Sequence, residues 1–99
     1  MSADADDQLR RTVLDLSARK DCAWAGIYFV EDDRLVLGPE AGRPDPERRT
    51  TVSVLWRDTR IAEIAVDGNI EPAELEAVAE RIADLCLVGW DTGGELWQS

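Results

Sequence analysis

The amino-acid sequence predicts a two-layer α+β domain, in which an N-terminal and a C-terminal helix pack on one face of an antiparallel four-stranded sheet. Apolar residues recur at helical spacing near both ends of the chain. They alternate along extended segments between the helices, and short polar turns separate these segments into two hairpins. Both amphipathic helices need an apolar surface, which one face of the sheet provides.

The N-terminal helix is expected over residues 4–20. Leu9, Val13 and Leu16 recur at helical spacing, and charged side chains fall on the other side. Acidic residues stand at its front and basic residues at its back, which complements the helix dipole.

The C-terminal helix is expected to open at residues 69–72, because Pro72 in a first turn gives up no hydrogen bond. Its apolar stripe consists of Leu75, Val78, Ile82 and Leu85. Gly89 is a natural stop, and Trp90 is placed to fold back onto the last turn.

The first hairpin is predicted from residues 23–30 and 35–37, which are aromatic and aliphatic and flank an acidic turn. Residues 38–47 are rich in proline and glycine. We expect them to form a connecting loop, because proline interrupts both helices and central strands.

The second hairpin is predicted from residues 51–57 and 60–66, joined by a tight turn at Asp58 and Thr59. The face predicted to meet the core carries Val52, Val54, Trp56, Ala62, Ile64 and Val66. The opposite, mixed face carries Ser53, Leu55, Arg57, Ile61, Glu63 and Ala65. Arg57 and Glu63 are expected to be cross-strand neighbours there.

The composition excludes several classes of function. The 99 residues carry a formal net charge of −10, which opposes binding to nucleic acid. The longest apolar run, residues 22–30, is far short of the roughly 20 residues that a membrane helix requires. The acidic N-terminus does not resemble a secretory signal, so a cytoplasmic protein is expected.

The numbers of cysteines and histidines limit the metal sites and catalytic groups that the chain can form. The chain has 2 cysteines, Cys22 and Cys86, and no histidine. We therefore expect two reduced thiols, no metal and no cofactor, because the commonest metal ligand and general base is missing.

The segment Trp-Ala-Gly-Ile-Tyr-Phe-Val-Glu-Asp-Asp-Arg-Leu-Val-Leu-Gly-Pro, residues 24–39, strongly resembles the first hairpin of GAF domains of the free methionine-R-sulfoxide reductase type. The resemblance resumes at residues 50–56 and 61–67 and includes the closing helix from Pro72. It implies a GAF-like, or profilin-like, arrangement of the predicted helices and strands.

Carried over residue by residue, the resemblance places Trp24 and Tyr28 in the aromatic wall of a ligand pocket and makes Asp67 the second acid of an Asp-x-Asp element. Ala65 stands where the first acid is expected, and Thr51 where another acid precedes a strand. Neither cysteine falls at a catalytic position of the family. The proline-rich loop replaces the family's long central segment, so we expect a truncated domain without reductase activity.

The leading functional hypothesis is a non-catalytic GAF-like regulatory or protein-interaction module in signalling. It would comprise one compact domain over residues 1–89 and a C-terminal tail over residues 90–99. The alternative is a small-molecule sensor with a reduced pocket on the open face of the sheet.

The partner is expected to be a second copy of the chain or another protein. Trp24, Tyr28, Leu55 and Ile61 would form an exposed apolar patch on the mixed face. Two competing arrangements remain open. Trp90 or Trp97 of the tail would cap this patch, or the terminal helices of two copies would pair through Leu14 or Leu87.

Overall fold

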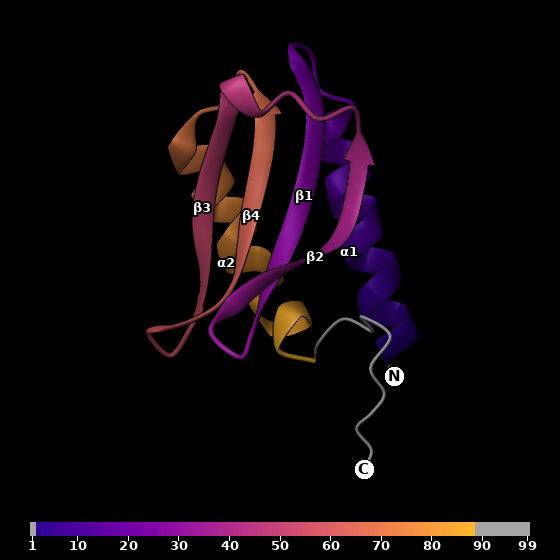
Figure 1. Cartoon of the computed structure of the whole chain (residues 1–99). Coiled ribbons are helices and arrows are strands. Elements are labelled where there is room, and N and C mark those ends of the chain that lie inside the picture. The colour runs from indigo at the N-terminus through magenta and orange to yellow at the C-terminus, as the bar shows by residue number, and fades with distance from the viewer. Residues whose placement is uncertain (1, 89–99) are drawn as a thin grey trace.

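The computed structural model describes residues 2–88 and has the predicted two-layer α+β architecture. In chain order the elements are α1 (Ser2–Ser17), β1 (Cys22–Glu31), β2 (Arg34–Gly42), a 3-10 helix (Pro46–Arg48), β3 (Arg49–Trp56), β4 (Thr59–Gly68) and α2 (Pro72–Val88). The sheet order is β2-β1-β4-β3, and all neighbours are antiparallel. Both helices lie on one face of the sheet (Figure 1).

The core lies between this face and the two helices. It includes the predicted stripes of both helices and the predicted inner face of the second hairpin. Its largest buried members include Leu9, Ile27, Ile64 and Leu75, each 0% exposed. The prediction of a shared helix-covered face is confirmed.

Both hairpins turn on two residues with positive φ. Asp32 and Asp33 connect β1 to β2, and Arg57 and Asp58 connect β3 to β4. Two successive positive φ values match the right-handed twist of the flanking strands, and aspartate tolerates them better than most residues. The second turn lies one residue earlier than predicted.

The predicted loop over residues 38–47 is wrong in its first half, because β2 continues to Gly42. Pro39 is tolerated because β2 is an edge strand, and the ladder shifts by one residue between Gly26 and Tyr28 of β1. The link from β2 to β3 is therefore only residues 43–48. It crosses the end of the sheet from one edge to the other (Figure 1).

Helix α1 ends at Ser17, so Arg19 does not cap its dipole as expected. Arg19 instead forms an ion pair with Glu74 of α2. Among residues 2–88, no helix is long and apolar enough to cross a membrane. The predicted tail and the predicted contacts of Trp90 and Trp97 lie outside the described residues.

Candidate functional site

The open face of the sheet, opposite the helices, is built around the indole of Trp24. A Cβ atom added at Gly26 would collide with Cη2 and Cζ2 of Trp24, so the indole lies directly over Gly26. The indole N–H donates a 2.9 Å hydrogen bond to Oε1 of Glu40 on β2. Glycine is required at position 26 because only a bare backbone lets the ring lie flat on the sheet.

Arg49 covers the indole from the other side. Its guanidinium carbon lies 4.4 Å from the centre of the Trp24 ring, within the range of a cation–π contact. The same guanidinium forms a two-point ion pair with Asp67, with Nε–Oδ1 at 2.6 Å and Nη2–Oδ2 at 2.8 Å. Arg49 and Asp67 are direct cross-strand neighbours of β3 and β4.

Asp67 is fully buried, and the chain satisfies its charge. Besides the two bonds from Arg49, its Oδ2 accepts a 2.7 Å bond from the backbone N–H of Asp45 in the link before β3. The hydrogen bonds from Arg49 lower the pKa of Asp67 below its ordinary value, against the opposing effect of burial. Asp67 in turn raises the pKa of Arg49, so the pair stays fully charged.

The guanidinium of Arg49 has N–H donors that these contacts with Asp67 do not use. Nη1 donates a 3.3 Å hydrogen bond to the hydroxyl of Tyr28, whose ring centre lies 6.5 Å from that of Trp24. Three of the five N–H groups of Arg49 are used in these contacts, and its side chain is 26% exposed. Because Tyr28 accepts from Arg49, its own O–H proton is free to donate. The open face thus presents N–H and O–H donors beside an aromatic ring.

The two thiols differ in accessibility, and both are free. Cys86 is buried in the core, where desolvation and the charge of Asp84 raise its pKa to about 12. Cys22 is half-buried at the start of β1, with Sγ 3.9 Å from the carbonyl oxygen of Asn69. A register shift separates Cys22 from Trp24, and Cys22 packs against the helix-side core. Cys22 therefore lies at the rim of the sheet, at the end where Asp67 lies.

The structure unites only part of the predicted site. Trp24, Tyr28 and Asp67 meet on the open face, as expected from the resemblance, but Trp24 is 1% exposed and adds nothing to an apolar patch. Leu55 is exposed at the far edge of the sheet. Ile61 is the extra residue of a bulge in β4 and packs against the core. The predicted four-residue patch is therefore wrong.

The predicted pair of Arg57 and Glu63 is also wrong. Arg57 lies in the β3–β4 turn, with φ 51° and its guanidinium 5.7 Å from the centre of the Trp56 ring. Glu63 instead forms an ion pair with Arg60. The shift of the turn by one residue removes Arg57 from the strand, which is why the expected pairing fails.

Arg49 and Glu40 belong to the site but not to the residues that the sequence predicts for it. Arg49 lies just before the predicted strand over residues 51–57, whereas β3 begins at Arg49 and brings it opposite Asp67. Glu40 lies in the predicted loop over residues 38–47, whereas it is part of β2. No cluster of metal-ligating side chains occurs in the part of the chain that the structure describes. Away from this site, a hollow of about 320 Å³ lies between β3 and α2, and one of about 270 Å³ lies beside Cys86.

Comparison with known proteins supports the fold but gives no family assignment. No family model matches the chain, and no curated protein matches it. A solved structure of a type II free methionine-R-sulfoxide reductase from Thermoplasma acidophilum has a TM-score of 0.73 at 15% identity, over 90% of this chain and 96% of that one. The free methionine-R-sulfoxide reductase of Staphylococcus aureus, solved in complex with its substrate, has a TM-score of 0.54 at 16% identity, over 85% and 94%.

These likenesses show a shared GAF-like α+β fold. They also correct the leading functional hypothesis, since both neighbours are enzymes, whereas the sequence was interpreted as a non-enzymatic signalling module. That interpretation relied on family positions that this chain does not fill. The likeness in fold extends over nearly the whole length of the chain.

Proposed function

We propose that the protein is a thiol-dependent reductase of a small sulfoxide, with free methionine-R-sulfoxide as the substrate to test first. The proposal is carried by one arrangement. Arg49, held rigidly by Asp67 and Trp24, turns unused N–H donors to the open face beside the Tyr28 hydroxyl. The likeness to two reductases of this substrate supports the choice of reaction.

The donor set suits a sulfoxide. The sulfoxide oxygen carries a high negative charge and would accept hydrogen bonds from Arg49 and Tyr28. These bonds would stabilise the negative charge on that oxygen as it changes during reduction. The half-exposed Leu37 on β2 pairs with Tyr28 across the ladder and offers an apolar surface for the methyl and methylene groups of the substrate. Asp67 acts through Arg49 as a positioning residue.

Cys22 is assigned as the nucleophile, because burial keeps the Cys86 thiol protonated. Cys22 attacks the sulfoxide sulfur, the S–O bond breaks, and the oxygen is retained as Cys22 sulfenic acid while the sulfide is released. Two equivalents of a thiol reductant then return the sulfenic acid to thiol, giving one disulfide and one water. Cys22 lies at the rim of the sheet, at the end where Asp67 lies, and packs against the helix-side core. The proposal therefore requires the sulfoxide sulfur to reach over this rim from the open face.

The proposal also includes a shortened family architecture. Residues 43–48 alone join β2 to β3 here, which supports the view that a longer central segment of the reductase family is absent. The site is consequently an open surface on the sheet. We expect a high KM, because the substrate is held by few contacts.

Steady-state turnover tests the function. Purified protein with dithiothreitol should convert free methionine-R-sulfoxide to methionine. Cys22→Ser should abolish turnover, while Cys86→Ser, the matched thiol control, retains it. Tyr28→Phe should lower kcat about tenfold or more through loss of a proton donor. Absence of methionine formation by the wild type, or full activity of Cys22→Ser, refutes the proposal.

A further inference from the structure

The free edge of β3 is chemically unprotected. Residues 50–56 contain neither a charged residue nor a proline, and within residues 2–88 β3 pairs with β4 alone. The opposite edge strand, β2, carries Pro39 and a bulge. Natural proteins usually block an exposed edge with such features, because its open N–H and C=O groups can pair with another chain.

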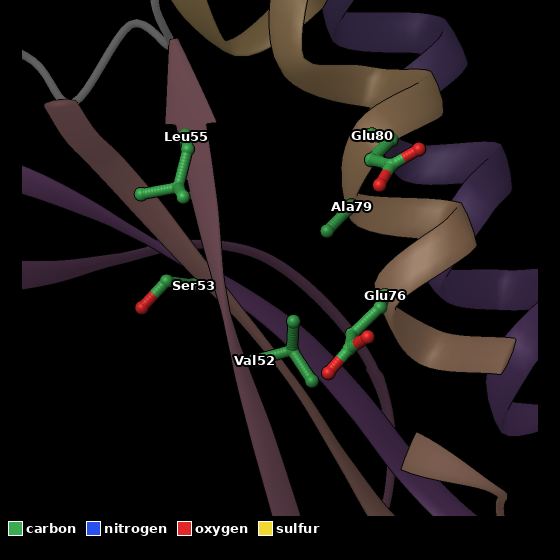
Figure 2. A pocket seen from close by; sticks show the side chains of 6 residues that line it. All are labelled: Val52, Ser53, Leu55, Glu76, Ala79 and Glu80. Carbon is green, nitrogen blue, oxygen red and sulfur yellow. The ribbon is translucent and has the colours of Figure 1, made fainter. Parts of the chain in front are cut away.

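A hollow of about 320 Å³ runs between this edge and α2. Val52, Ser53 and Leu55 line it from the strand, and Glu76, Ala79 and Glu80 line it from the helix. Figure 2 shows Glu76 reaching from α2 toward Val52, with Glu80 one turn further along. Within residues 2–88, neither Glu76 nor Glu80 forms an ion pair. The groove therefore combines an apolar wall with two unneutralised carboxylates.

From this groove we infer a docking site for an extended basic segment of another protein, which adds as a fifth strand beside β3. Alternate side chains of an added strand point to opposite faces of the sheet. Those on the helix side would meet Glu76 and Glu80, and the added strand would also cover Leu55, which lines the same groove and is 52% exposed. The chemistry that fits is an alternation of basic and apolar residues.

A second copy of this chain fits the groove poorly. Antiparallel pairing of two β3 strands would bring two α2 helices side by side on the same face of a continuous sheet. Glu76 and Glu80 of each copy would then approach like charges, in a chain whose net charge is already −10. A basic partner instead neutralises both carboxylates.

The probe is a fluorescent, end-blocked peptide that alternates lysine and valine and matches the 8 residues of β3 in length. Binding to the full chain is measured by anisotropy, and the contact is mapped by NMR. We expect saturable binding that weakens as salt rises, with the largest amide shifts in residues 50–56. A glutamate–valine peptide should bind at least tenfold more weakly.

Glu76→Gln/Glu80→Gln should weaken binding about tenfold, from the loss of two charge contacts. Asp32→Asn/Asp33→Asn is the matched control: it removes the same charge at the β1–β2 turn, where asparagine accepts the positive φ, and should change affinity less than twofold. Leu55→Ser, at an exposed position, should also weaken binding.

Four outcomes would overturn the inference. They are equal losses of affinity in both double variants, equal binding of the acidic peptide, no binding of the lysine–valine peptide, or amide shifts outside the β3 edge. Concentration-dependent dimerisation abolished by Leu55→Ser would overturn it in favour of a second copy.

Discussion

Arg49 on β3 and Asp67 on β4 lie directly opposite each other and share two parallel hydrogen bonds, of 2.6 and 2.8 Å, on the open face of the sheet. Asp67 is 0% exposed, and Arg49 is 26% exposed. The buried carboxylate thus fixes the orientation of a cation whose outer edge still reaches solvent. The stability of the sheet and the chemistry of the proposed site therefore depend on the same pair.

Replacing Arg49 alone should destabilise the protein. Arg49→Ala leaves the Asp67 carboxylate buried without its cation, which costs about 3 kcal/mol of unfolding free energy. Urea unfolding followed by circular dichroism measures it. Arg49→Ala/Asp67→Asn should recover part of the loss, since a neutral amide tolerates burial better. A loss below about 0.5 kcal/mol in the single variant, the range of ordinary surface substitutions, would contradict this prediction.

The Asp67 pair should make stability depend on pH in the acid range. Because the folded-state pKa of Asp67 is lowered, its contribution is fully present above its ordinary pKa of 3.8 and is lost as the pH falls through the folded value. The difference in unfolding free energy between wild type and Asp67→Asn should therefore be constant near neutrality and shrink below about pH 4.

The control for the acid effect is Asp58→Asn in the β3–β4 turn, where φ is 67°. Its difference from wild type should vary less with pH over the same range. A difference for Asp67→Asn that stays constant down to pH 2 would show that the carboxylate is not specially stabilised in the folded state.

Gly26 should tolerate no side chain. Gly26→Ala places a methyl group against Cη2 and Cζ2 of Trp24, which displaces the indole from the sheet and costs about 1–3 kcal/mol. Near-ultraviolet circular dichroism should lose part of its tryptophan signal. Ser53→Ala, at an exposed position of β3, should remain within about 0.5 kcal/mol of wild type. An unchanged spectrum for Gly26→Ala would contradict the stacked geometry.

The two thiols should react at different rates. In native protein at pH 8, Ellman's reagent should titrate Cys22 rapidly and Cys86 slowly, because burial raises the pKa of Cys86 to about 12. Both should react at once in guanidinium. Rapid modification of both thiols in the native wild-type protein would be inconsistent with a buried Cys86. Rapid modification of Cys86 in the native Cys22→Ser variant would be equally inconsistent.

The layers of the fold were predictable because they depend on periodicity. Leu9 and Leu75 recur with their neighbours at helical spacing, and both are buried as expected. Pro39 misled the interpretation, since proline excludes a central strand but not the bulged edge strand that β2 is. Because residues 38–47 were predicted to be a loop, the sequence did not indicate that Glu40 accepts a hydrogen bond from Trp24.

The site was harder to predict because it depends on register. Trp24, Tyr28 and Asp67 were identified through resemblance, whereas Arg49 lies just before the predicted strand and becomes visible only when β3 and β4 are aligned. A one-residue error at the turn misplaced Arg57, and a bulge turned Ile61 to the core. Alternation along a single strand does not reveal either event.

A single-turnover experiment tests the proposed function most directly. Reduced protein, freed of reductant, is mixed with free methionine-R-sulfoxide in the presence of dimedone. The account predicts one equivalent of methionine and one dimedone adduct, located by mass spectrometry at Cys22, with neither formed by Cys22→Ser. No methionine, or methionine formed while Cys22 stays unmodified, would contradict the assignment of the protein as a reductase acting through this thiol.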